Sequence, residues 1–199
     1  MKTTSASTVV YRRRLIREKV LQVLYAYEIS KEPLIFVEEQ QLDELKTHRS
    51  EFEFAKELIS HVVQHEAELD AIIKSKAFHW EFDRIAVIDK ILLRMGICEL
   101  IHFPDIPPKV TINEAIEIAK AYSTTKSGPF INGILDAIHN ELKNSSSLHK
   151  TGRGLLTKSL SPGPPHAVHQ PAPVAKAPTV SRKPPLKKKH LRAKFQKGI

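Results

Sequence analysis

The chain has 199 residues and a formal net charge of +9, which suits one ordinary domain with an appendage. Its single cysteine, Cys98, excludes an internal disulfide framework and a cysteine-based zinc site. No apolar run approaches the roughly 20 residues that a membrane span needs, and the first ten residues lack the apolar segment of a secretory signal. We therefore expect a soluble, cytoplasmic protein.

The positive charge is concentrated near the C-terminus. Residues 145–199 hold 12 lysines and arginines and no acidic residue, whereas the first 144 residues hold 19 basic and 22 acidic residues. Eight of the 13 prolines lie in the same segment, and its apolar residues follow no period, so it cannot bury enough surface to offset the entropy of ordering it. We predict a flexible N-terminus over 1–10, a folded domain over 11–144 and a disordered basic tail over 145–199.

The first half of the folded domain shows helical periodicity and no convincing strand alternation. A helix is predicted over 11–30, where apolar residues recur at helical spacing, and a shorter helix follows over 34–45. A long third helix is predicted over 50–74. Ser50 and Glu53 match a capping box, which would start that helix.

The second half of the domain predicts three more helices. The segment 83–102 is apolar on several sides, so it should be the central and most buried element. Thr111 and Glu114 match a second capping box, which would start a helix over 111–122. The last helix is predicted over 130–143. About six helices with short connections predict an all-α helical bundle.

Four arginines near the start of the first helix are the main candidates for ligand binding: Arg12, Arg13, Arg14 and Arg17. Arg17 follows Arg14 by three residues and Arg13 by four, so we expect these three to share a surface. Cations are unfavourable at the positive end of a helix dipole, which favours an anionic partner. RNA phosphates would supply affinity without reading sequence. A solvated charged face is the alternative interpretation.

Five other residues could contact a single-stranded nucleic acid. Gln22 and Tyr25 follow the arginines on the first helix, where an amide and an aromatic ring could read and stack an unpaired base. Lys126, Phe130 and Asn132 surround the start of the last helix, whose free N–H groups could bind a phosphate. Tyr25 and Phe130 could equally well be core residues.

The sequence contains no catalytic motif that we can identify. A glycine-rich phosphate loop, a GxSxG elbow and an HExxH arrangement are all missing. His61 and His65 have a spacing that can hold a metal, but no third ligand stands out nearby in the sequence. We therefore expect no enzymatic activity, no cofactor and no metal.

Three segments resemble the NusB family. The run Arg12–Glu18, followed by Leu21–Tyr25, resembles the opening helix of that family, and Asp83–Leu100 resembles its central helix. The most specific match is Val110–Lys120 followed by Phe130–Asp136, which is similar to the family signature INEAIELAK…FVNGVLD. The three segments occur in the family's order and cover the whole predicted domain.

The resemblance implies a transcription antitermination factor that promotes ribosomal RNA transcription. In this family, two small helical bundles pack side by side, and the protein pairs with the small ribosomal protein NusE. The pair binds the single-stranded boxA element of nascent RNA within an antitermination complex on RNA polymerase. The NusE surface of the family lies broadly on the central helices, where Phe82, Arg84 and Glu99 are the candidate partner-binding residues.

Two other functions are considered. Similar domains form the RNA-binding part of ribosomal RNA cytosine methyltransferases, but these enzymes need a large catalytic domain, and residues 145–199 predict no strands. A helical adaptor that binds only protein would make the arginine cluster incidental. The sequence does not decide between a monomer and a dimer.

Overall fold

The computed structural model describes residues 4–78 and 80–155, with side chains from residue 13 onward. Within these ranges every regular element is helical, which confirms the predicted all-α class. The α-helices are α1 (Thr4–Ser30), α2 (Leu34–Gln41), α3 (Arg49–Gln64), α4 (Glu66–Lys76), α5 (Val87–His102), α6 (Pro108–Tyr122) and α7 (Ser127–Asn144). Three short 3-10 helices are η1 (Asp43–Leu45), η2 (Phe82–Arg84) and η3 (Gly152–Leu155). None of the described helices is long and apolar enough to cross a membrane.

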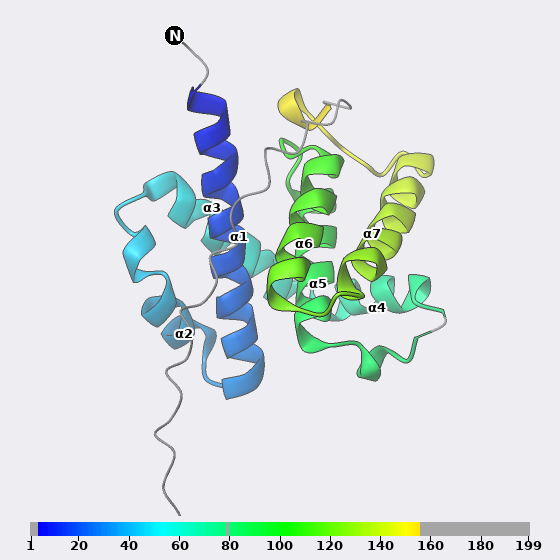
Figure 1. The fold of residues 1–199 in the computed structure, drawn as a ribbon, viewed down its shortest axis with the longest axis horizontal. Coiled ribbons are helices and arrows are strands. Elements are labelled where there is room, and N and C mark those ends of the chain that lie inside the picture. The colour runs from blue at the N-terminus through cyan, green and yellow to red at the C-terminus, as the bar shows by residue number, and fades with distance from the viewer. Residues whose placement is uncertain (1–3, 79, 156–199) are drawn as a thin grey trace, which may run out of the picture. The chain divides into compact units, whose positions relative to one another are not determined.

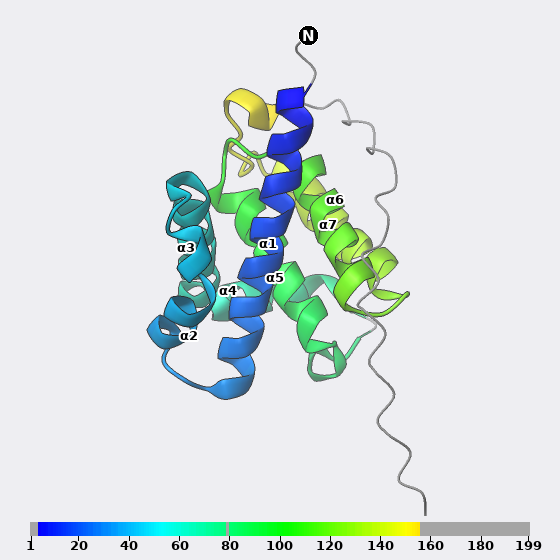
Figure 2. The same cartoon turned by 60° about the vertical axis from the view of Figure 1, so that its left-hand side comes forward.

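Helix α1 joins two groups of helices. It contacts α2 and α3 on one side and α5 and α6 on the other, as the two ribbon views show (Figures 1 and 2). Helical spacing predicted a buried stripe of Ile16, Val20, Val23, Leu24 and Tyr27. The first four are buried together with Leu21, which was not predicted, and Tyr27 is half-buried. The helix already begins at Thr4, within the segment 1–10 that we expected to be flexible.

Helix α5 is the central element, as its all-round apolar composition predicted. Every residue from Ile91 to Leu100 is buried, and the helix contacts α1, α3, α4, α6 and α7. A Cβ atom on Gly96 would lie 2.9 Å from Cδ1 of Leu135 on α7. The absence of a side chain at this position therefore lets α5 and α7 approach each other closely.

The predicted long helix over 50–74 is two helices, so this prediction was wrong. The chain bends at His65, between α3 and α4. Helix α3 packs against α1 and α5, whereas α4 packs against α5 and α7. Local periodicity could not reveal the bend because both halves keep an apolar face, and only their packing partners differ.

Neither predicted capping box is present. Helix α3 begins at Arg49, and Ser50 donates a hydrogen bond to Glu51 (2.7 Å). Helix α6 begins earlier than predicted, with Pro108 as its first residue, where the missing N–H costs nothing. Thr111 and Glu114 therefore lie inside α6, and their side chains are free to contact other helices.

The ordered chain continues past the predicted domain boundary at Asn144. Lys150 Nζ donates to the backbone carbonyls of Glu99 (3.0 Å) and Phe103 (2.9 Å), and the N–H of Thr151 donates to the carbonyl of Pro104 (2.9 Å). These contacts add a second donor to the Glu99 and Phe103 carbonyls, which also accept from the N–H groups of Phe103 and Ile106, and so attach residues 150 and 151 to the C-terminal end of α5 and the loop after it. Residues 145–155 thus pack on α5, and the predicted disorder of 156–199 falls outside the described residues.

Candidate nucleic-acid interface

The innermost of the candidate arginines forms a buried ion pair. Arg17 donates to both carboxylate oxygens of Glu99 on α5, at 2.6 and 2.8 Å, and Thr111 on α6 donates to the same carboxylate at 2.9 Å. The side chains of Arg17 and Glu99 are only 4% and 2% exposed. Burial acts to lower the pKa of Arg17, but the Glu99 carboxylate more than offsets it, so the guanidinium stays charged. This pair links three helices.

Arg14 and Arg13 make ion pairs closer to the surface. Arg14 donates to both oxygens of Glu114 on α6, at 2.8 and 2.9 Å, and this hydrogen bonding raises its pKa. Arg13 lies 3.7 Å from Asp105 and is 42% exposed, and its guanidinium stands 5.3 Å from the ring centre of Phe54. Each of these arginines therefore has an acidic partner across the packing interface of α1.

Because of these contacts, fewer arginines share one surface than the spacing predicted. Arg13 and Arg14 reach the surface, but Arg17 does not share it, because its side chain turns inward to Glu99. The side chain of Arg12 lies outside the described residues. The sequence could not show that acids on α5 and α6, 82 and 100 positions away, would pair with this helix.

Further along α1, Tyr25 is 42% exposed, so its ring is available at the surface rather than in the core. Gln22 is half-buried and lies beside Tyr122 of α6. The Tyr122 hydroxyl donates to Glu18 at 3.2 Å. Gln22 therefore lies where α1 meets the end of α6, with Tyr25 one turn further along α1.

A buried carboxylate holds the turn between α6 and α7. Asp89 of α5 accepts hydrogen bonds from Ser123 and from Ser127, both at 2.7 Å. This arrangement fixes the start of α7, just after the exposed Lys126. Asp89 was not among the predicted site residues. A charged residue within an otherwise apolar helix could have indicated that it has a structural or functional role.

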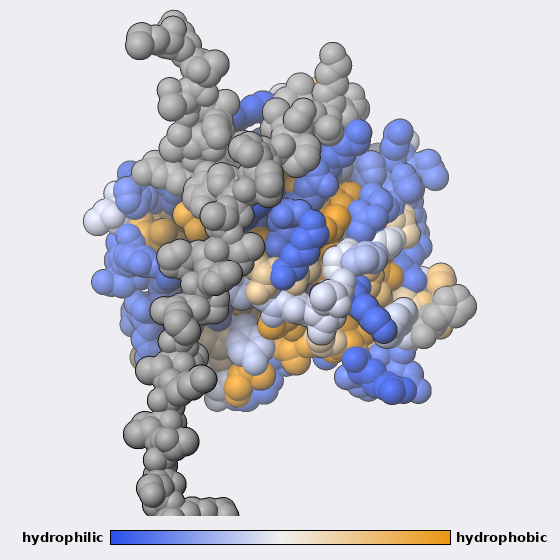
Figure 3. Space-filling view, viewed as in Figure 1, coloured by the Kyte–Doolittle hydropathy of each residue, from blue (hydrophilic) through white to orange (hydrophobic). Residues whose placement is uncertain are grey.

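Phe130 and Asn132 lie on the first turns of α7, where the sequence analysis expected nucleic-acid contacts. The Phe130 ring lies 5.3 Å from that of Trp80, which is 58% exposed in the loop before η2. Phe78, in the same loop, is also exposed, and Figure 3 shows apolar side chains at the right-hand edge of this face. Neither Trp80 nor Phe78 was predicted as a site residue, although a stretch of closely spaced aromatics was visible in the sequence.

Residues 14–140 match the NusB family. A curated relative in Chloroherpeton thalassium, described as transcription antitermination protein NusB, is 47% identical over 149 residues, which cover 72% of this chain and 69% of the relative. The chain belongs to the NusB family. A NusB relative in Salinibacter ruber is 45% identical over 148 residues and is covered to 91% of its length.

Solved NusB structures have the same fold. NusB of T. maritima is 39% identical and matches with a TM-score of 0.60, over 65% of this chain and 91% of its own. A complex described as antitermination factors NusB and NusE with double-stranded RNA matches at 28% identity and a TM-score of 0.58, over 66% of this chain and 98% of the matched chain. The two small bundles implied by the resemblance to NusB are thus present.

The three residues proposed to face NusE occupy different environments. Phe82 in η2 is half-buried, with the ammonium groups of Lys74 and Lys90 at 4.6 and 5.2 Å from its ring centre. Arg84, also in η2, is exposed. Glu99 is not the exposed residue that we expected, because it is buried against Arg17. Any influence of Glu99 on a partner would therefore act through the position of α1.

Proposed function

We propose that this protein binds boxA-type single-stranded RNA together with a NusE-type ribosomal protein and promotes ribosomal RNA transcription. As a member of the NusB family it is a transcription antitermination factor, which acts by assembly and not by catalysis. It would act within the antitermination complex on RNA polymerase, in the cytoplasm where the transcript emerges. The observation that supports this proposal most directly is the match to a NusB chain whose structure contains NusE and RNA.

The exposed residues of α1 suit an RNA that lies along that helix. Arg13 and Arg14 would contact phosphates, since their side chains are 42% and 31% exposed. A phosphate can compete with the exposed Asp105 for Arg13, whereas Arg14 would keep its buried partner Glu114. Tyr25 offers an exposed ring for stacking an unpaired base, and Gln22 offers an amide for its edge. The buried Arg17 would position the other two arginines by fixing α1 against α5.

The start of α7 would supply a second set of contacts. Lys126 is exposed and lies at the N-terminal end of α7, where the positive end of the helix dipole favours a phosphate. Phe130 and Asn132 lie nearby on α7, and Trp80 extends the aromatic surface. For the NusE-type protein, the exposed Arg84 and the half-buried Phe82 are the proposed contacts on η2.

An RNA titration tests this function. A fluorescent boxA-like strand, a scrambled strand and a duplex are titrated with the protein, with and without the NusE-type partner, at two salt concentrations. We expect selective binding to the boxA-like strand that tightens when the partner is added. Binding that ignores both sequence and partner, and that is lost when residues 145–199 are deleted, would refute the proposal. Tighter binding to the duplex would refute the proposal that the RNA is bound as a single strand.

Replacement of Arg13 by Ala tests the α1 surface. Loss of one phosphate contact should weaken binding of the boxA-like strand and reduce the slope of log K against log salt by about 0.7. The melting temperature should change little, because Arg13 is 42% exposed and its ion pair is at the surface. Arg49→Ala is the matched control, since Arg49 pairs with Glu53 on the outer face of α3. If the two variants bind RNA with equal affinity, Arg13 does not contact the RNA.

A further inference from the structure

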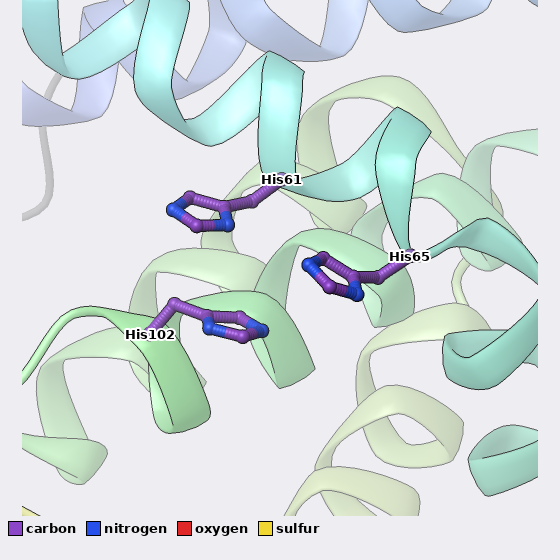
Figure 4. A group of neighbouring side chains, drawn as sticks. All are labelled: His61, His65 and His102. Atoms are coloured by element: carbon purple, nitrogen blue, oxygen red, sulfur yellow. The ribbon is translucent and has the colours of Figure 1, made fainter.

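Three histidines from two helices meet at one place. His61 lies in the last turn of α3, His65 follows it at the bend before α4, and His102 is the last residue of α5. Ring nitrogens of all three lie within 4.8 Å of one another. Figure 4 shows the rings of His61 and His65 extending from their helix in the same direction, with the ring of His102 below them. The packing of α3 on α5 thus supplies the third ligand that the sequence did not reveal.

The three rings are half-buried and stacked on one another. The ring centres of His61 and His65 lie 4.6 and 5.0 Å from that of His102, with interplanar angles of 10° and 21°. Burial, with the two neighbouring imidazoles, lowers the pKa of His102. A metal binds imidazole in its neutral form, through the lone pair of one ring nitrogen.

Two of the histidines show features expected of metal ligands. Nδ1 of His61 is buried and has no hydrogen-bond partner within the described part of the chain, an arrangement that is unfavourable unless something else binds there. Nδ1 of His65 lies 3.2 Å from a carboxylate oxygen of Glu68. When Nδ1 donates to that carboxylate, Nε2 is left as a lone pair, the arrangement by which a carboxylate orients a metal-binding histidine.

We propose that His61, His65 and His102 bind one Zn²⁺ ion, with Glu68 as a positioning residue and solvent at the fourth position. Imidazole nitrogens suit zinc, and three of them with an open position form a recognised zinc geometry. Tetrahedral coordination at about 2.0–2.1 Å requires the nitrogens to approach to about 3.4 Å. The rings must therefore turn out of their stack so that their lone pairs converge. Half-burial leaves these side chains room to do so.

The bound ion would tie the α3–α4 bend to the C-terminal end of α5. That end also carries the Lys150 contacts and Phe103, whose ring lies edge-on to His61 at 5.9 Å. An ion that binds only the folded state stabilises it by mass action. The zinc site would therefore act on the same helix end that holds Glu99 and, through it, Arg17 on α1.

The test uses the full chain without a histidine tag, stripped with a chelator and dialysed. Zinc chloride is added, and its stoichiometry and affinity are measured by calorimetry, with Co²⁺ as a spectroscopic probe of tetrahedral coordination. We expect one high-affinity ion per chain, a tetrahedral Co²⁺ spectrum and a higher melting temperature with zinc. His102→Ala should weaken zinc binding at least tenfold. His48→Ala, which removes an exposed histidine outside the cluster, should not.

Two results would overturn the proposal. One is the absence of zinc binding at micromolar concentrations, and the other is equal zinc binding by the wild type and His102→Ala. The four histidines of residues 145–199 (His149, His166, His169 and His190) are retained in every variant, so their contribution to zinc binding is the same in all of them. If His102→Ala does not fold, His65→Ala replaces it, because His65 lies at the bend and is only half-buried. Glu68→Gln should weaken zinc binding less than removal of a ligand.

Discussion

The Arg17–Glu99 pair combines two charges that are both withdrawn from water. Desolvation of each charge opposes burial, and the favourable geometry of two short hydrogen bonds offsets it only while both partners are present. Thr111 uses a further lone pair of the carboxylate. The pair therefore contributes mainly to the way in which α1 sits on α5 and α6, and either residue alone would be a buried unpaired charge.

Single replacements in this pair should be strongly destabilising. Glu99→Gln or Arg17→Met should lower the free energy of unfolding by about 3–5 kcal/mol, because each leaves one uncompensated charge inside the protein. Urea unfolding followed by circular dichroism measures this. The double variant should lose less than the sum of the two single losses. If the single variants unfold like Arg49→Ala, whose ion pair with Glu53 is exposed, the buried pair has no special role in stability.

Lys150 predicts a pH dependence of stability. Burial lowers its pKa from 10.5 to about 8. Between these two values the folded protein has lost the proton while the unfolded chain still holds it, so the unfolded state binds more protons. The stability contributed by Lys150 should therefore rise as pH increases from about 8 toward 10.5.

The comparison with Lys150→Met isolates this effect. The difference in unfolding free energy between the wild type and the variant, measured by urea unfolding at several pH values, should shift in favour of the wild type across that window. Well below pH 8 the difference should not vary with pH through this group. A constant difference across the whole range would mean that Lys150 titrates as an exposed lysine.

At the scale of elements, α5 and α7 approach so closely because Gly96 has no side chain. A Cβ at this position would lie 2.9 and 3.0 Å from the two methyl carbons of Leu135, which is itself fully buried. Since interiors are close-packed, Leu135 cannot move without disturbing its neighbours. Helix propensity alone would favour Ala over Gly by about 1 kcal/mol, so packing and propensity oppose each other here.

Two glycine replacements separate these effects. Gly96→Ala should destabilise the protein by about 1–3 kcal/mol, the usual range for overpacking. Gly133→Ala, in α7, should be neutral or stabilising by up to about 1 kcal/mol, because no atom lies within 4 Å of its added Cβ. Thermal unfolding of both variants provides the measurement. A stabilising Gly96→Ala would show that Leu135 can readjust freely.

At the scale of the whole molecule, charge and order are distributed differently along the chain. The folded part up to residue 144 has more acidic than basic residues, and the net positive charge comes from residues 145–199. The first part of that basic segment is ordered, since residues 145–155 contact the end of α5 through Lys150 and Thr151. Two truncations can therefore separate stability from electrostatic attraction to RNA.

A chain that ends at Leu155 should keep the melting temperature of the full protein but bind RNA more weakly, with a smaller salt dependence and unchanged preference for the boxA-like strand. A chain that ends at Asn144 should also melt at a lower temperature, because it loses the Lys150 contacts with α5. Thermal unfolding and RNA titration of both chains measure this. Loss of sequence preference in the longer truncated chain would assign specificity to the basic tail.

Much of this organisation could be read from the sequence because it depends on local patterns. Apolar residues at helical spacing predicted α1 with its buried stripe, and the all-round apolar run predicted α5 as the central helix. The family signature around α6 and α7 likewise lies in continuous segments, so it could be identified without knowing how the helices pack.

Contacts between distant segments were decided by tertiary structure alone. The sequence predicted that Arg17 belongs to an exposed basic cluster. The packing of α1 on α5 instead places it against Glu99 and buries both residues. His102 joins His61 and His65 only because α3 lies against the end of α5. Spacing along one helix determines which side chains share a face, whereas the packing of helices determines what that face meets.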